Sequence, residues 1–310
     1  MPRAAMIGAG LIGRSWAMVF ARAGWEVAIH DPAPGAAEQA LGLVAAGLAQ
    51  QAEYGLARDP EAAAKRVRPA RDLADALDGA TFVQENAPET VDAKVPLFRE
   101  LDRLSAPDVI LASSTSAIVA SRFTAELPGR ARCLVAHPVN PPHLVPIVEL
   151  SGAPWTAPET IARARAVYES IGQVPIVVRK EIEGFILNRL QGALLAEAFR
   201  LVGEGFVSPQ DLDKTLKDGL GLRWSFMGPF ETIELNAPGG MADYCARYTG
   251  FYRSLQSAPA APGVYDPPNV EAILREWGEV ADRARLEART RWRDGRLAAL
   301  RAHKASQAQA

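Results

Sequence analysis

Close to its first residue the chain carries Met6-Ile7-Gly8-Ala9-Gly10-Leu11-Ile12-Gly13, in which three glycines stand at the spacing G-x-G-x-x-G. A short apolar run, residues 4–7, precedes the glycines and predicts a buried strand. Residues 11–23 are compatible with a helix, and Gly24 supplies a natural stop. In this order, a strand, a glycine turn and a helix predict a site for a dinucleotide.

Each glycine of this stretch has a separate physical role. Gly8 allows a tight turn, Gly10 lets the backbone come close to a pyrophosphate, and Gly13 lets the helix pack on the strand. The helix begins with Leu11 and Ile12, and the free N–H groups of its first turn attract an anion. We therefore assign all five residues to cofactor binding.

An acidic residue follows the second predicted strand. The run Trp25-Glu26-Val27-Ala28-Ile29-His30 leads into Asp31. A carboxylate there accepts from both ribose hydroxyls of an adenosine and repels a 2'-phosphate, and Pro32 and Ala33 supply no arginine to meet one. The sequence predicts NAD rather than NADP as the cofactor. The alternative, a glycine-rich turn without a ligand, stays open.

Length and composition narrow the class of protein. A chain of 310 residues is long enough for two domains. Its 34 Lys and Arg nearly balance 36 Asp and Glu, so nothing calls for nucleic acid or an anionic membrane as a partner. The two cysteines, Cys133 and Cys245, stand far apart and outside any C-x-x-C pattern, which suits a reducing compartment. We expect a cytoplasmic location and no metal.

The apolar character of residues 4–21 raises the alternative of a signal peptide or a membrane span. Arg14 and the three glycines interrupt this stretch, and the dinucleotide site accounts for the same residues better. No other stretch approaches the ~20 uninterrupted apolar residues of a membrane span. We expect a soluble protein with no membrane partner.

Strands and helices alternate through the first half of the chain. Short apolar runs at residues 80–84, 109–112 and 133–136 read as strands, and helical patterns separate them. This alternation predicts an α/β fold, a Rossmann-type doubly wound parallel sheet, which we assign to residues 1–183. Ligands of such sheets collect at the carboxyl ends of the strands, where this sequence places its polar clusters.

Beyond Gly184 the pattern becomes helical. Residues 185–202 are apolar on more than one face, which indicates a helix buried on several sides at the centre of an all-α domain and a contact between subunits. We assign residues 184–310 to this helical substrate and dimerisation domain, with an extended C-terminal tail. Residues 257–268 are rich in proline and read as a connector, and the arginine-rich tail from Asn269 reads as a solvated helix.

Four polar residues suit one reaction: Ser116, His137, Glu149 and Asn188. Hydride transfer from an alcohol carbon to a nicotinamide requires a base for the hydroxyl proton, a task that suits histidine. Glu149 could bond the far ring nitrogen of His137, fix its tautomer and stabilise the imidazolium. Ser116 and Asn188 could hydrogen-bond the substrate oxygen or the alkoxide that develops there.

Each of the four also has a plain structural alternative. A histidine before a proline is often a loop residue, Ser116 could belong to a turn, and Glu149 could be a surface acid. Asn188 could be a helix side chain that bonds locally. The residue types alone leave these alternatives open.

At these positions the sequence resembles the 3-hydroxyacyl-CoA dehydrogenase family, and within it the λ-crystallin/L-gulonate 3-dehydrogenase branch. The resemblance covers residues 1 to about 255. Besides the glycine stretch it rests on four motifs: Ser113-Ser114-Thr115-Ser116, His137-Pro138-Val139-Asn140-Pro141, Gly184-Phe185-Ile186-Leu187-Asn188-Arg189-Leu190 and Gly228-Pro229-Phe230-Glu231.

The resemblance implies roles for individual residues. It makes His137 the base, Glu149 its orienting acid, and Ser116 and Asn188 the groups that bind the substrate oxygen. It also places Glu89 and Lys94 along the nicotinamide half of NAD, and we add Ser116 and Asn140 to the cofactor contacts. The family further implies a homodimer through the helical domain.

Departures from the acyl-CoA pattern bear on the substrate. Acyl-CoA enzymes typically read S-N-T-S-S and H-F-F-N-P, whereas this chain reads Ser113-Ser114-Thr115-Ser116-Ala117 and His137-Pro138-Val139-Asn140-Pro141. The segment 219–229 is longer than its equivalent in those enzymes and carries Arg223, as the gulonate branch does. Our hypothesis is that Arg223 binds a free carboxylate bidentately. The alternative is an arginine that pairs with a helix acid.

We therefore expect NAD-dependent oxidation of the 3-hydroxyl of a small 3-hydroxy acid, L-gulonate-like, to the 3-keto acid. The rival substrates are a 3-hydroxyacyl-CoA or a carnitine-type acid with the same catalytic residues. A structural, NAD-binding role like that of λ-crystallin belongs to a different class, and the joint presence of Ser116, His137, Glu149 and Asn188 argues against it.

Overall fold

The computed structural model describes residues 1–278 and 282–307 and divides them into two compact units. The first unit combines residues 1–188 with residues from 289 onward, and the second comprises residues 189–288. This division differs from the expected one, which placed everything after residue 183 in one helical domain. From Arg289 on, the last helix, α14 (Arg283–Ser306), belongs to the first unit. Its Ala298 is buried, and its Arg301 donates to two backbone carbonyls of that unit.

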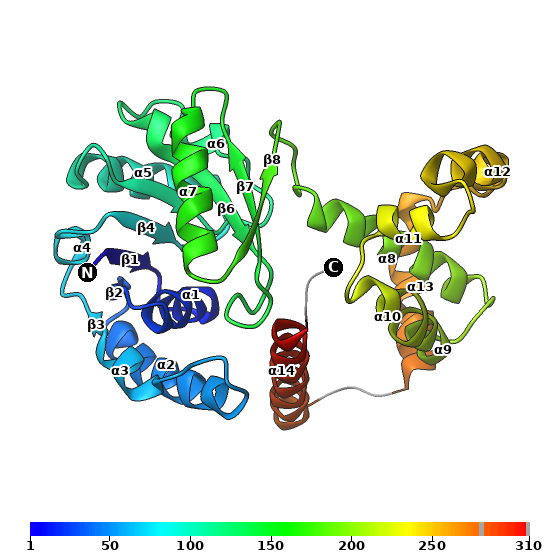
Figure 1. The fold of residues 1–310 in the computed structure, drawn as a ribbon, viewed down its shortest axis with the longest axis horizontal. Helices are drawn as coiled ribbons and strands as arrows, with labels where there is room; N and C mark the ends of the chain where they lie inside the picture. Colours follow the sequence, from blue (N-terminus) through cyan, green and yellow to red (C-terminus); the bar gives the residue numbers. More distant parts are fainter. Residues whose placement is uncertain (279–281, 308–310) are drawn as a thin grey trace. The chain divides into compact units, whose positions relative to one another are not determined.

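The first unit is built on one sheet of eight strands, drawn in blue to green in Figure 1. Its order is β3-β2-β1-β4-β5-β6-β7-β8, and all neighbours are parallel except β6 and β7, which are antiparallel. The strands are β1 (Arg3–Ile7), β2 (Glu26–His30), β3 (Val67–Pro69), β4 (Phe82–Glu85), β5 (Ile110–Ser113), β6 (Cys133–Pro138), β7 (Ile147–Gly152) and β8 (Val174–Val178).

Helices cover both faces of this sheet, which confirms the doubly wound fold. They are α1 (Leu11–Arg22), α2 (Ala36–Glu53), α3 (Pro60–Lys65), α4 (Leu73–Leu77), α5 (Val91–Leu104), α6 (Ser121–Thr124), the 3₁₀ turn η1 (Arg130–Arg132) and α7 (Pro158–Ser170). One core packs α1, α2, α3 and α7 on one face, and a second core packs α4, α5 and α6 on the other. Successive β1 residues alternate between the two cores, as strand geometry requires.

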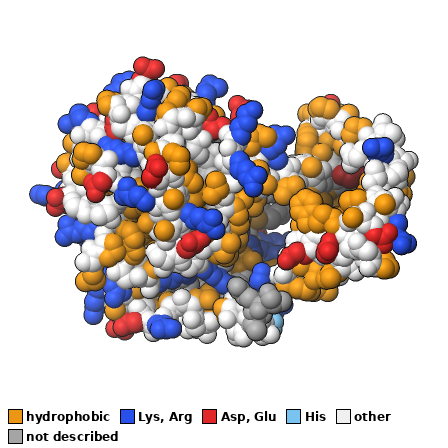
Figure 2. All heavy atoms as spheres, turned by 45° about the horizontal axis from the view of Figure 1, so that its top comes forward, with side chains coloured by type: hydrophobic (Ala, Val, Ile, Leu, Met, Phe, Trp, Pro, Cys, Tyr) orange, Lys and Arg blue, Asp and Glu red, His pale blue; other side chains and the backbone are white. Residues whose placement is uncertain are grey.

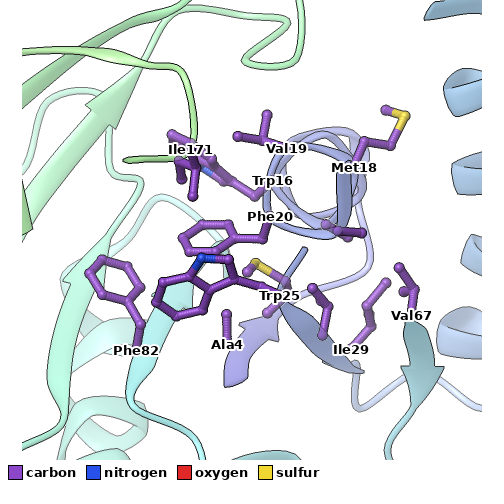
Figure 3. Packing of buried hydrophobic residues seen from close by; sticks show 14 of the residues in the cluster. Ala4, Trp16, Met18, Val19, Phe20, Trp25, Ile29, Val67, Phe82 and Ile171 are labelled. Atoms are coloured by element: carbon purple, nitrogen blue, oxygen red, sulfur yellow. The ribbon is translucent and has the colours of Figure 1, made fainter. Parts of the chain in front are cut away.

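Aromatic side chains fill the core beneath α1. Phe20 lies between Trp25 and Phe82, with ring centroids 5.1 Å and 5.6 Å away, and Figure 3 shows it reaching from α1 toward the sheet. Trp16, one turn earlier, is fully buried and contacts the ring of Tyr168 on α7. These contacts fix α1, and with it the glycine turn at its amino end, on the sheet.

All regular elements among the described residues of the second unit are helices. Its elements are α8 (Leu187–Gly203), α9 (Pro209–Lys214), a π-helical segment η2 (Thr215–Leu220), α10 (Gly221–Trp224), α11 (Pro229–Leu235), α12 (Gly240–Leu255), the 3₁₀ turn η3 (Pro262–Tyr265) and α13 (Pro267–Trp277). The first two residues of α8 belong to the first unit, because the second unit begins at Arg189. Ser208 caps α9 by accepting from the N–H of Asp211. Among the helices of residues 1–278 and 282–307, none is long and apolar enough to cross a membrane.

Candidate active site

The glycine turn lies where the strand order of the sheet reverses, between β1 and β4. Gly8 has φ +106°, and a Cβ there would come within 2.7 Å of the carbonyl oxygen of Asn86 at the end of β4. A Cβ on Gly13 would lie 1.8 Å from the Gly8 oxygen. Around Gly10, by contrast, no described atom lies within 4 Å of an added Cβ. The first and third glycines are therefore required by packing, whereas Gly10 leaves room for a ligand beside the backbone.

Asp31 follows β2 and reaches back to this turn. Its Oδ2 accepts a hydrogen bond of 2.8 Å from the N–H of Ala9, and its Oδ1 accepts from Ala33 at 2.9 Å. The carboxylate stands beside the glycine turn, where the ribose of a dinucleotide is recognised. Residues Gly8 to Gly13 and Asp31 thus fit an NAD molecule.

Two neighbouring strands hold the candidate base and its acid. His137 on β6 and Glu149 on β7 are directly opposed in the antiparallel register. The Nδ1 of His137 lies 2.8 Å from the Oε2 of Glu149, and the two residues are 5% and 1% exposed. Since an ionised carboxylate only accepts hydrogen bonds, Nδ1 carries the proton and Nε2 is left as the basic nitrogen.

The second oxygen of Glu149 anchors the start of α8. Its Oε1 accepts hydrogen bonds of 2.9 Å and 3.0 Å from the N–H groups of Ile186 and Leu187. A carboxylate at a helix amino end is favoured by the free N–H groups there and by the helix dipole. Glu149 therefore joins His137 to the helix that carries Asn188.

Phe185, just before α8, packs on the imidazole. It is fully buried, its ring centroid lies 5.4 Å from that of His137, and it is the non-glycine residue of the described chain with positive φ, at 49°. Such backbone strain costs on the order of 1–3 kcal/mol and persists where surrounding contacts enforce it. Phe185 shields one face of the imidazole and was not among the predicted site residues. Its only signal in the sequence was its place in the Gly184–Leu190 motif.

Asn188, Ser116 and Glu89 form the next part of the site. The Nδ2 of Asn188 donates to the backbone carbonyl of Ser116 at 2.7 Å. Glu89 Oε1 accepts from the N–H groups of Ser116 and Ala117 at 3.0 Å and 3.2 Å, and from the hydroxyl of Thr115. Glu89 thus orders the turn after β5, and the exposed Ser116 side chain remains free to meet a ligand.

Lys94 points into the protein rather than to its surface. Its Nζ lies 2.9 Å and 3.0 Å from the two carboxylate oxygens of Glu85, and both side chains are at most 1% exposed. Glu85 also accepts from the N–H of Ala87 at 2.6 Å and from the hydroxyl of Ser113. The sequence reasoning missed Glu85, although an acid at the end of an otherwise apolar strand was a signal. A contact between Lys94 and the nicotinamide remains a prediction.

Two further predicted residues lie apart from these contacts. Asn140 is exposed in the loop between β6 and β7, next to a cis peptide bond to Pro141. Arg223 is exposed on α10 of the second unit. The pKa of Tyr244 is raised, chiefly by its hydrogen bond with Tyr252, and Arg223 acts in the opposite direction through its charge. Among the described side chains Arg223 pairs with no carboxylate, so the helix acid of the alternative interpretation is not seen.

The described residues hold no cluster of His, Cys, Asp and Glu suited to a metal ion. What they bring together is a histidine bonded to an orienting acid, and a glycine turn built for a dinucleotide. The same acid bonds the start of the helix whose amide, on Asn188, meets the Ser116 turn. Removal of a proton from an alcohol, coupled to hydride transfer, is the chemistry that this set of groups can perform.

Comparison with known proteins agrees with this geometry. Residues 3–182 match the 3-hydroxyacyl-CoA dehydrogenase NAD binding domain, and residues 184–275 match the C-terminal domain of the same enzymes. The chain belongs to the 3-hydroxyacyl-CoA dehydrogenase family. It is an NAD-binding oxidoreductase of that type.

Individual relatives are similar along nearly the whole chain. Lambda-crystallin of Oryctolagus cuniculus is 41% identical over 93% of this chain and 92% of its own length. An L-carnitine dehydrogenase of Pseudomonas putida is 35% identical over 98% and 94%. Among solved structures, an NAD⁺-dependent 5-formyl-3-hydroxy-2-methylpyridine 4-carboxylic acid 5-dehydrogenase matches with a TM-score of 0.85 at 30% identity, covering 99% of this chain and all of that one.

Proposed function

We propose that the protein oxidises the 3-hydroxyl of a small 3-hydroxy acid to a ketone, with His137 as the general base. The observation that carries this proposal is the 2.8 Å contact between His137 Nδ1 and Glu149 Oε2. It orients the ring so that Nε2 is the free basic nitrogen of the neutral imidazole, on the edge of the sheet where the glycine turn and Ser116 also lie. NAD supplies the acceptor for the hydride.

The chain's own groups divide the remaining work. Nε2 of His137 takes the hydroxyl proton, and Glu149 stabilises the imidazolium that results. The Ser116 hydroxyl and the Asn188 amide hydrogen-bond the oxygen as negative charge develops on it. Phe185 keeps water from one face of the imidazole. Glu89 holds the Ser116 turn, which fixes the distance between Ser116 and Asn188.

A free carboxylate on the substrate is the second part of the proposal, and Arg223 is its partner. The exposed guanidinium has no carboxylate partner among the described side chains, so its planar fork is available for a bidentate contact. Similarity to L-carnitine dehydrogenases favours small hydroxy acids. Replacing Arg223 by Met should raise the KM for such an acid by about tenfold or more and leave the KM for NAD unchanged.

A 3-hydroxyacyl-CoA is the rival substrate, because the family's matched domains carry that activity in their description. The two are separated by measuring NAD reduction with L-gulonate, 3-hydroxybutyrate, L-carnitine and 3-hydroxybutyryl-CoA under identical conditions. The proposal requires the highest kcat/KM for a free acid. A kcat/KM for the thioester that exceeds those of all free acids would contradict it.

We also propose a homodimer through the helical unit. Many large apolar side chains of this unit are exposed in the single chain, among them Leu190, Phe226, Phe230 and Phe251 at 57–70% exposure. Figure 2 shows hydrophobic atoms over much of the visible surface of this unit, on the right. Exposed apolar area of this extent is typical of a subunit interface. Light scattering that gives the mass of one chain would contradict the dimer.

The cytoplasmic location stays a prediction from cysteine usage.

A further inference from the structure

Two arginines from distant parts of the chain bind the same carbonyl oxygen. Arg22, the last residue of α1, donates from Nη1 to the carbonyl oxygen of His143 at 2.9 Å. Arg301, on α14, donates from its own Nη1 to that oxygen at 2.8 Å. Two cationic guanidiniums therefore share one acceptor oxygen, in the loop between β6 and β7.

The other partners of both guanidiniums are neutral. Arg22 also donates to the amide oxygen of Gln51, and Arg301 donates from Nη2 to the carbonyl of Gly172 at 2.8 Å. Within residues 1–278 and 282–307, neither arginine meets a carboxylate. The Nε and Nη2 protons of Arg22 and the Nε proton of Arg301 have no partner in this part of the chain. Donors thus remain for a further ligand.

Both arginines are half-buried, so their surroundings hydrate this uncompensated charge only in part. Burial, with the charge of Arg301 as a second cause, lowers the pKa of Arg22 to about 9. Burial also lowers the pKa of His143 to about 4, helped by the charges of Arg22, Arg301 and Arg293. Arginine keeps its proton in proteins, so deprotonation does not relieve the repulsion. A bound anion would relieve it, because its negative charge offsets the charge of both guanidiniums and it accepts their hydrogen bonds.

We propose that Arg22 and Arg301 form a site for a small phosphate-type oxyanion between α1 and the C-terminal helix α14. The planar forks of two arginines match the oxygens of a phosphate or sulfate bidentately. The site is separate from the dinucleotide site, because Arg22 stands at the carboxyl end of α1, about 16 Å along the helix from its first residue. Residues 289–307 lie beyond the matched family domains, which end at residue 275.

The anion would tie α14 to the NAD-binding unit. Arg301 is the residue of α14 that bonds both His143 and Gly172, so an anion shared with Arg22 adds a charged link to two neutral ones. Without the anion, the two guanidiniums repel each other across the interface of helix and unit. Anion concentration would then set how firmly the C-terminal helix is held.

The test uses the full chain with NAD bound, titrated calorimetrically with inorganic phosphate in a chloride buffer of constant ionic strength. We expect saturable binding that weakens at least tenfold in Arg301→Gln and less in Arg301→Lys, which keeps the charge. Arg296→Gln is the matched control, because Arg296 lies exposed on the same helix. Phosphate also acts on proteins unspecifically, by exclusion from their surface. The proposal is therefore judged by the difference in phosphate affinity between the Arg301→Gln and Arg296→Gln variants.

The source of the oxyanion is distinguished by parallel titrations with pyrophosphate and coenzyme A. Binding of coenzyme A alone, lost in Arg301→Gln, assigns the site to the phosphate of a larger ligand and still supports it. A second readout is the imidazole of His143, one of four histidines, followed by NMR. Its pKa should rise when phosphate neutralises the arginines. The proposal is overturned if the ligands that bind have equal affinity for wild type and Arg301→Gln, or if none of phosphate, pyrophosphate and coenzyme A binds.

Discussion

Glu149 contacts His137 from the neighbouring antiparallel strand and, with its other oxygen, holds the first N–H groups of α8. One buried carboxylate therefore sets both the tautomer of the candidate base and the position of the helix that presents Asn188. The antiparallel pairing of β6 with β7 makes this possible, because it brings the start of β7 to the same edge of the sheet as the end of β6.

Replacing Glu149 by Gln should lower kcat by about 10²-fold or more, because an amide can present its N–H to Nδ1 and reverse the imidazole tautomer. The KM for NAD should change little. Steady-state kinetics check both values, with Glu169→Gln as the control, since Glu169 is an exposed acid that pairs with Arg165 on α7. A Glu149→Gln enzyme with wild-type kcat would remove this residue from the mechanism.

Gly10 and Gly13 should respond differently to alanine. A Cβ at Gly13 collides with the Gly8 carbonyl, so Gly13→Ala should lower the free energy of unfolding by about 1–3 kcal/mol. A Cβ at Gly10 meets no protein atom within 4 Å among the described residues, so Gly10→Ala should fold normally but weaken NAD binding by about tenfold or more. Urea unfolding and NAD titration measure the two effects. The same loss of stability in both variants would show that Gly10 is a packing residue as well.

Asp31 should set the choice of cofactor. Asp31→Asn keeps a hydrogen-bond acceptor for the N–H of Ala9 but removes the charge that repels a 2'-phosphate. We expect the ratio of kcat/KM for NADP to that for NAD to rise about tenfold or more. This is the size of effect expected when the hydrogen bonds from the ribose of NAD lose a charged acceptor. Asp59→Asn, a cap residue of α3, is the control. An unchanged ratio would leave the preference for NAD unexplained.

His143 should make the protein sensitive to mild acid. Its folded pKa is lowered to about 4 from 6.5, so the unfolded chain binds this proton first as the pH falls. The contribution of His143 to the free energy of unfolding is fully present above about pH 6.5. It declines by about 3 kcal/mol in total as the pH falls from 6.5 to 4. Unfolding by urea in phosphate-free buffers measures it. His143→Gln should flatten this decline, whereas His303→Gln, on the exposed end of α14, should not.

Much of this architecture followed from local patterns. The apolar runs with polar ends predicted β1, β2, β4, β5 and β6 and the edge that holds the site, and the glycine spacing predicted the turn between β1 and α1. The short edge strand β3 was not predicted, because three residues carry no clear pattern. The reversed direction of β7 was not predicted, because a short strand has the same residue pattern in either direction. That direction decides that Glu149 lies opposite His137.

Other contacts were beyond reach because their partners are distant in sequence. The pairing of Lys94 with Glu85 depends on how α5 packs against β4. The return of α14 to the first unit depends on Arg301 meeting a loop more than a hundred residues earlier. An arginine-rich helix reads as solvated, and only the fold shows which arginine is half-buried.

The turnover of His137→Gln tests the central claim most directly. Glutamine cannot take up the hydroxyl proton, so kcat should fall by about 10²–10⁴-fold with the best free hydroxy acid. The affinity for NAD, titrated in parallel, should stay within a factor of about two, because the imidazole bonds Glu149 rather than the glycine turn. A variant that retains at least half of the wild-type kcat would contradict the assignment of His137 as the base.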